Sequence, residues 1–71
     1  MKIELVKINK NPVTVVAGKY AFPIENGRIA HNECSRVGAE YNGNIKDYND
    51  AYELACFAYE NNIYDSEIDN Y

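Results

Sequence analysis

Hydrophobic residues in the segment from 47 to 61 recur at the spacing of an α-helix, about 3.6 residues per turn. One arc of the predicted helix is apolar, and the opposite arc carries acids and amides. The apolar arc holds Tyr48, Ala51, Tyr52, Leu54, Ala55, Ala58 and Tyr59, with Cys56 at its border. Phe57 falls on the acidic arc instead. The pattern predicts an amphipathic helix that Asp47 caps at its start and that Asn61 and Asn62 end.

The N-terminal part of the chain alternates apolar and polar residues or joins β-branched residues in runs, as strands do. We expect a strand at 2–8, a turn at 9–12 and a second strand at 13–17. At Gly18 the apolar positions change phase, so Gly18 is either a bulge in one long strand or a tight turn between two strands. Pro23 lacks a backbone donor, and we therefore expect it at a sheet edge.

The dipeptide Asn26-Gly27 is the strongest turn signal in this half, because both residues tolerate the positive φ angles of a tight hairpin. It predicts a hairpin between the residues on its two sides. Residues 32–43 fit a loop, a short helical turn or a further strand, and we favour the loop or the helical turn.

Strands followed by one helix predict a small two-layer α+β domain. In it, a three- or four-stranded antiparallel meander is packed by one C-terminal amphipathic helix. We expect residues 1–62 to form this single domain and residues 63–71 to form an acidic C-terminal tail. The residues of the tail that could still dock on the domain are Ile63, Tyr64, Ile68 and Tyr71.

Charge is divided along the chain more sharply than the net value of −4 suggests. Residues 1–46 carry all seven basic residues and four acids, whereas residues 47–71 carry seven acids and no basic residue. The acidic segment repels nucleic acid and favours basic protein surfaces, although such charge also serves solubility. A chain of 71 residues is near the lower limit for a self-sufficient core, and its seven tyrosines suit partly exposed surfaces. Both features favour a partner or a second copy.

His31 and Cys34 form the one cluster of reactive side chains, and folding could bring Cys56 beside them. The paired spacings of metal sites are missing, so we expect an ordinary histidine, two reduced thiols, no metal and no cofactor. His31-x-Glu33 likewise lacks the second half of a zinc deaminase signature. The four glycines are too scattered for a phosphate-binding loop. We therefore expect neither an enzyme nor a small-molecule substrate.

No hydrophobic run reaches the roughly 20 residues of a membrane span. The first ten residues alternate charge with hydrophobicity and do not form a secretory signal. We expect an intracellular, cytoplasmic protein that does not contact the membrane.

Acidic residues along the helix and the tail lead to the main functional hypothesis, a non-enzymatic protein-binding module. Their spacing can imitate a phosphate path or meet a basic groove, and Phe57 would be an aromatic anchor inside a polar rim. Otherwise Phe57 is a singly exposed ring, or one that Ile63 or Ile68 covers. The predicted contact residues are Asp47, Asp50, Glu53, Phe57, Glu60, Tyr64, Asp65, Glu67 and Asp69.

In composition only, the chain resembles the short Asn-, Lys-, Ile- and Tyr-rich acidic proteins that bacteriophages make to disable or redirect host proteins. The partner would then be a basic surface of a host protein, either nucleic-acid-binding or regulatory. The alternative is a structural or assembly subunit, in which the basic sheet of one copy faces the acidic helix of another in a homodimer.

A third hypothesis is weak nucleic-acid binding through the N-terminal sheet. Its cations would be Lys7, Lys10, Lys19 and Arg28, and its stacking rings would be Tyr20 and Phe22. Seven cations against four acids in this half are a weak electrostatic footprint, so we do not expect nucleic acid as the main partner.

Overall fold

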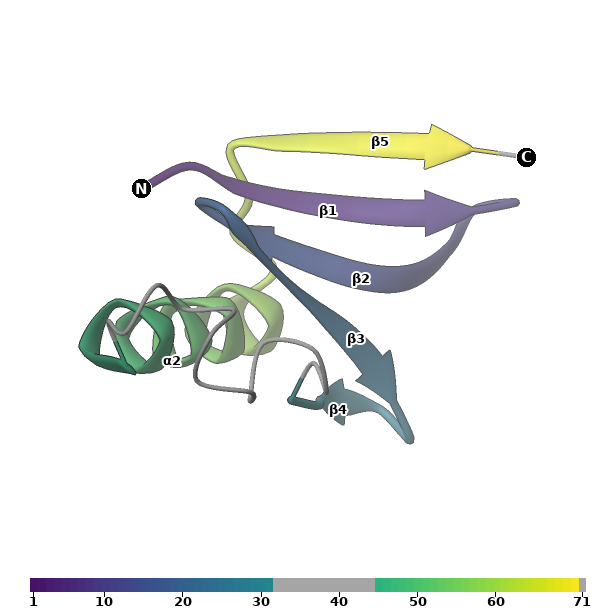
Figure 1. The fold of residues 1–71 in the computed structure, drawn as a ribbon. Coiled ribbons are helices and arrows are strands. Elements are labelled where there is room, and N and C mark those ends of the chain that lie inside the picture. Colours follow the sequence, from purple (N-terminus) through teal and green to yellow (C-terminus); the bar gives the residue numbers. More distant parts are fainter. Residues whose placement is uncertain (32–44, 71) are drawn as a thin grey trace.

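The structure, a computed structural model, describes residues 1–31 and 45–70 of the chain. These residues form five strands and one helix (Figure 1). In chain order the elements are β1 (Ile3–Ile8), β2 (Asn11–Ala17), β3 (Tyr20–Glu25), β4 (Arg28–Ile29), α2 (Ile45–Asn61) and β5 (Ser66–Asn70). The strands form one sheet in the order β4-β3-β2-β1-β5, in which β5 runs parallel to β1 and the other neighbours are antiparallel. The predicted α+β class is confirmed.

The predicted count of three or four strands and the purely antiparallel meander are wrong, because the segment assigned to an acidic tail supplies β5. The acids of β5 do not hold it away from the domain, since two of them contact the N-terminal half. Glu67 forms an ion pair with Lys7 (Nζ to Oε1, 2.7 Å), and Asp69 Oδ1 accepts a hydrogen bond from the backbone N–H of Lys10 (3.2 Å). The helix therefore precedes the last strand and is not the C-terminal element.

Three two-residue turns join the antiparallel strands, and each contains residues with positive φ angles. Asn9 and Lys10 (φ 53° and 69°) connect β1 to β2, and Asn26 and Gly27 (φ 53° and 76°) connect β3 to β4. Two successive positive φ angles are the mark of the type I′ hairpin turn. Gly18 (φ 63°) begins the turn between β2 and β3. The predicted Asn26-Gly27 hairpin is confirmed, and Gly18 lies in a tight turn.

Pro23 lies within β3, where it limits the pairing with β4. Its carbonyl accepts a hydrogen bond from the backbone N–H of Ala30 (2.8 Å). Because proline has no N–H to donate in return, the ladder cannot continue past this pair. This explains why β4 ends at Ile29 after only two residues.

The helix begins two residues earlier than predicted, so Asp47 lies inside the first turn and does not occupy the N-cap position. Its carboxylate remains near the positive end of the helix dipole. The predicted C-terminal end is confirmed, since Asn62 has a left-handed φ of 55°. The N–H of Ile63 donates to the Ala58 carbonyl (3.0 Å) and the N–H of Asn62 donates to the Tyr59 carbonyl (3.4 Å). These two bonds form a Schellman motif.

One face of the sheet packs against α2 (Figure 1), and the helix contributes its alanine-rich side to this contact. Aromatic rings meet across this layer, and the Tyr20 and Tyr48 rings are 5.5 Å apart in an edge-to-face arrangement. Leu54 was predicted on the apolar arc but is 37% exposed. It lies at the border of that arc, and only the arc's centre reaches the sheet. The buried core consists of Ile3, Leu5, Val15, Ala17, Tyr20, Phe22 and Ile29 from the sheet and Tyr48, Ala51, Ala55 and Ala58 from α2.

Within the described residues, the structure holds no helix that is both long enough and apolar enough to cross a membrane.

Candidate functional site

The outer face of α2 exposes two large apolar side chains next to each other. Phe57 is 56% exposed and Leu54 is 37% exposed. Residues three positions apart are neighbours on a helix surface, so the two side chains form one small apolar area. The position of Phe57 opposite the core, predicted from the helical phase, is confirmed. Neither Ile63 nor Ile68 is buried against the ring, since they are themselves 58% and 41% exposed.

Polar residues of α2 surround this apolar area. We call the whole surface the Leu54–Phe57 patch, which comprises Asp50, Glu53, Leu54, Phe57, Glu60 and Asn61. The polar members are exposed, and three of them are acids. The amide of Asn61 is fixed, because its Nδ2 donates to the backbone carbonyl of Phe57 (2.9 Å). An apolar centre inside a polar rim is the arrangement found in many protein interfaces.

Lys46 lies one turn before the patch and partly neutralises it. Its Nζ contacts Asp50 Oδ2 at 2.8 Å, and both side chains are largely exposed. The hydrogen bond that Lys46 donates to Asp50 raises the pKa of Lys46. Such an exposed pair contributes little to folding because water and salt screen it. Glu53 and Glu60 are thus the acids of the patch that keep the strongest long-range attraction for a cation.

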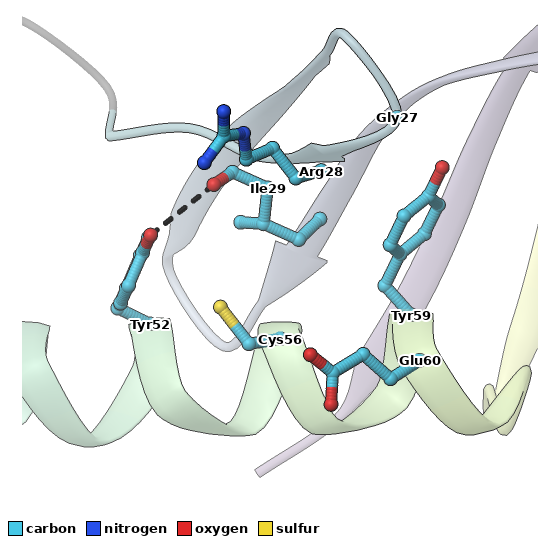
Figure 2. Close-up of a pocket in the computed structure, with 7 residues that line it drawn as sticks. All are labelled: Gly27, Arg28, Ile29, Tyr52, Cys56, Tyr59 and Glu60. Atoms are coloured by element: carbon cyan, nitrogen blue, oxygen red, sulfur yellow. Dashed lines mark hydrogen bonds between the residues drawn. The ribbon is translucent and has the colours of Figure 1, made fainter.

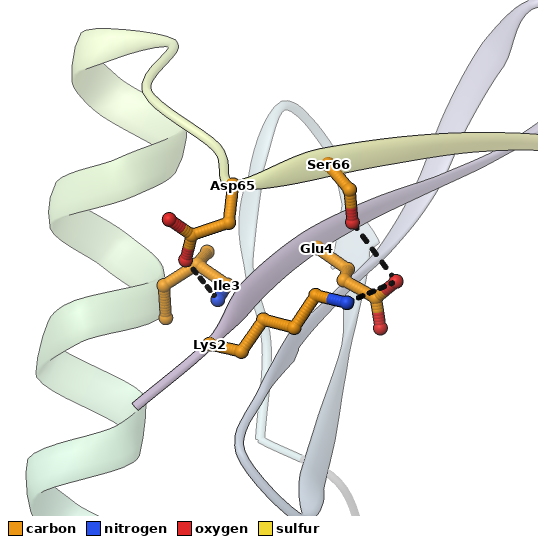
Figure 3. A network of polar contacts seen from close by, with 5 residues as sticks. All are labelled: Lys2, Ile3, Glu4, Asp65 and Ser66. Carbon is orange, nitrogen blue, oxygen red and sulfur yellow. Dashed lines mark hydrogen bonds and ion pairs between the residues drawn. The ribbon is translucent and has the colours of Figure 1, made fainter.

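The predicted contact residues that follow the helix are used inside the domain. The Asp65 carboxylate accepts a hydrogen bond from the N–H of Ile3 (2.7 Å), as Figure 3 shows. Glu67 and Asp69 make the contacts with β1 and its turn described above, and the ion pair with Glu67 raises the pKa of Lys7. Tyr64 is half-buried against the core. Folding therefore brings the acidic end of the sequence onto its basic start, whereas Asp50, Glu53 and Glu60 lie on the exposed face of α2.

Glu4, on the sheet face that α2 does not cover, is held by contacts with Ser66 and Lys2. Its Oε2 accepts a hydrogen bond from Ser66 Oγ (2.9 Å) and lies 3.9 Å from Lys2 Nζ (Figure 3). Val6 pairs with Ile68 beside it in the parallel ladder. The centre of this sheet face therefore combines the apolar pair Val6 and Ile68 with a carboxylate whose charge Lys2 partly neutralises.

A groove of about 580 Å³ lies between the β3–β4 hairpin and α2 (Figure 2). Sequence analysis missed it, because it forms only where the hairpin packs beside the helix. The one local sign of the groove in the sequence was Arg28, a cation directly after the Asn26-Gly27 turn. The groove is lined by Gly27, Arg28, Ile29, Tyr52, Cys56, Tyr59 and Glu60.

Tyr52 forms a fixed wall of this groove. Its hydroxyl donates to the carbonyl of Ile29 (3.1 Å), and the His31 ring stacks on its ring at 4.0 Å with an interplanar angle of 11°. Burial, with a smaller effect of the neighbouring Cys56, raises the pKa of Tyr52. The Nδ1 atom of His31 lies in a hydrogen bond with the hydroxyl of Tyr48 (2.7 Å). The histidine thus supports the groove wall.

Cys56 is a half-buried free thiol whose sulfur lies in the groove (Figure 2). The predictions for Cys34 fall outside the described residues. Within residues 1–31 and 45–70, no three His, Cys, Asp or Glu side chains come together as metal ligands would.

The two rings predicted to stack on bases do not lie on an exposed strand face. Tyr20 and Phe22 are 4% and 0% exposed, because they point from β3 into the core beneath α2. Bases could not stack on these rings without opening the domain. The alternation of β3 places aromatic residues on the face that the helix covers.

No protein-family model, curated protein or solved structure matches the chain.

Proposed function

We propose that this protein is a non-enzymatic binding module that uses the Leu54–Phe57 patch to occupy a basic surface of another protein. The observation that carries the proposal is the exposure of Phe57, 56%, at the centre of an acidic helix face. A large ring kept in water costs free energy that burial in a partner recovers, about 1.5–3 kcal/mol for a fully buried side chain. Aromatic anchors of this kind often dominate the energy of an interface.

The acids of the patch define the charge of the partner. Glu53 and Glu60 flank the ring, so a complementary surface carries Lys or Arg around an apolar pocket. A nucleic-acid-binding or regulatory surface has this character, and covering it would inhibit the partner. This form of the function also agrees with the resemblance in composition to phage proteins that disable host proteins.

The test begins with an affinity pull-down from the source cell, followed by surface plasmon resonance with the captured protein. We expect Phe57→Ala to weaken binding at least tenfold, about 1.4 kcal/mol, while the melting temperature stays within a few degrees. Ile8→Ala is the matched control, since Ile8 is 52% exposed and lies outside α2. Equal affinities for the wild type and Phe57→Ala would refute the proposal.

Charge reversal tests the acidic rim separately. We expect Glu53→Lys to slow association more than it speeds dissociation, because long-range attraction acts mainly on the on-rate. The difference between the variants should shrink as salt is added, since the screening length is about 8 Å at physiological ionic strength. An on-rate that neither the reversal nor salt changes would show that the rim serves only solubility.

Self-association is the second candidate, and the apolar centre of the uncovered sheet face favours it. Val6 and Val16 are half-buried there and Ile68 is 41% exposed. A dimer through these residues would resist salt, whereas a dimer between the sheet of one copy and the acidic helix of another would dissociate in salt. Sedimentation at low and high salt distinguishes both forms from a monomer.

A further inference from the structure

The groove between the β3–β4 hairpin and α2 has opposite charges at its two ends. Figure 2 shows the Arg28 guanidinium on the Tyr52 side and the Glu60 carboxylate beyond Cys56, toward the end of the helix. No ion pair joins either charge to another residue of the described chain. Both charges are therefore available to a ligand.

The length of α2 that lines the groove sets the size of that ligand. Tyr52 and Glu60 are eight residues apart on α2, which corresponds to about 12 Å along the axis. An extended peptide covers this length with three to four residues at about 3.3 Å each. A single amino acid cannot reach both ends, because its ammonium and carboxylate groups are attached to the same carbon.

The middle of the groove is apolar and is held in place before any ligand arrives. Ile29 is 5% exposed at its floor, and the Cys56 sulfur lies beside it. The Tyr52 wall is held by the hydrogen bond to Ile29 and by stacking on His31. A preformed wall lowers the ordering cost of binding.

We propose that this groove binds an extended peptide segment of a partner protein, with an apolar side chain at the centre, a carboxylate at the Arg28 end and a cation at the Glu60 end. The guanidinium of Arg28 can hold a carboxylate through two parallel hydrogen bonds. The two ends together carry no net charge, which favours a segment with one acid and one base over a polyanion such as nucleic acid. The groove shares Glu60 with the Leu54–Phe57 patch but does not depend on Phe57, so the response to Phe57→Ala distinguishes a failure of this proposal from a failure of the proposed function.

The probe is the synthetic peptide acetyl-Glu-Ala-Phe-Ala-Lys-amide, titrated into the ¹⁵N-labelled full chain and followed by NMR. We expect saturable shifts at the amides of Gly27, Arg28, Cys56 and Tyr59. Arg28→Glu should weaken binding by about tenfold, the effect of replacing an attractive charge contact by a repulsive one. Lys19→Glu is the matched control, because it makes the same charge change on the exposed β2–β3 turn.

A charge swap separates recognition from damage to the fold. The peptide with lysine at both ends should bind Arg28→Glu better than it binds the wild type, since each lysine then meets a carboxylate. Phe57→Ala should bind the original peptide as the wild type does. The proposal is overturned if the charge of the peptide ends makes no difference, if the shifts map outside the groove, or if Lys19→Glu weakens binding as much as Arg28→Glu.

Discussion

Ile3 and Asp65 exchange two hydrogen bonds where β1 and β5 begin. The N–H of Ile3 donates to Asp65 Oδ2 (2.7 Å), and the N–H of Asp65 donates to the carbonyl of Ile3 (2.8 Å). The two residues are 62 positions apart, so this contact closes nearly the whole chain. It sets the register in which Glu4 meets Ser66 and Leu5 meets Glu67.

We expect Asp65→Ala to lower the free energy of unfolding by about 1–2 kcal/mol, because it leaves a partly buried N–H without its charged acceptor. Asp65→Asn should cost less, since its amide oxygen can still accept the bond. Urea unfolding of the three proteins measures the difference. If Asp65→Ala were as stable as the wild type, the β1–β5 pairing would not depend on this contact.

Local signals were enough to predict α2 and the Asn26-Gly27 turn, whereas at Gly18 they left a bulge and a turn open. The apolar arc gave the helix and the outward position of Phe57, and Asn-Gly chemistry gave the β3–β4 hairpin. The strand β5 was missed because its acids find their partners in β1 and the following turn, about 60 residues earlier in the chain. A segment of like charges predicts a solvated tail until such distant cations are known. The local pattern therefore could not predict β5, because this strand depends on pairing with residues distant in the sequence.

The two candidate binding surfaces also differ in how far the sequence could predict them. The patch on α2 follows from the helical phase of one segment, and the sequence located its centre. The groove forms only where the β3–β4 hairpin lies beside α2. The local pattern therefore could not show that Arg28 and Glu60 line the same groove. For Tyr20 and Phe22, the alternation predicted one common face, but the position of the helix decides that this face is the core.

The backbone of Lys10 has a positive φ angle of 69°, which residues other than glycine and asparagine rarely adopt. We expect Lys10→Gly to stabilise the domain by about 0.5–1 kcal/mol, since glycine meets this angle without strain in a type I′ turn. The backbone N–H that donates to Asp69 is retained. Lys10→Ala should give no such gain, which distinguishes the backbone effect from the loss of a charge. Thermal unfolding of both variants checks the prediction.

Tyr20 and Tyr48 lie in edge-to-face contact but differ in how their hydroxyl groups are satisfied. The Tyr20 hydroxyl is buried and makes no hydrogen bond with the described residues, whereas that of Tyr48 bonds to His31 (2.7 Å). We expect Tyr20→Phe to be neutral or to stabilise the domain by about 1 kcal/mol, and Tyr48→Phe to destabilise it by a similar amount. The urea midpoint should therefore fall for Tyr48→Phe and stay unchanged or rise for Tyr20→Phe. A marked loss of stability in Tyr20→Phe would show that its hydroxyl has a partner.

Tyr64 links the stability of the domain to alkaline pH. Burial, followed by the nearby Tyr59 and Glu67, raises its pKa above the ordinary value of 10.0. The unfolded chain therefore releases this proton at a lower pH than the folded chain does, and stability falls as the pH rises through the raised pKa. Tyr64→Phe has no proton to release, so we expect it to lose less stability than the wild type between about pH 9 and pH 11. Urea midpoints measured across this range provide the test, with pH 7 as the reference at which ionisation of Tyr64 makes no contribution. Parallel pH profiles for the two proteins would mean that Tyr64 ionises equally readily in the folded and unfolded chains, and that its packing against the core does not exclude water from the hydroxyl.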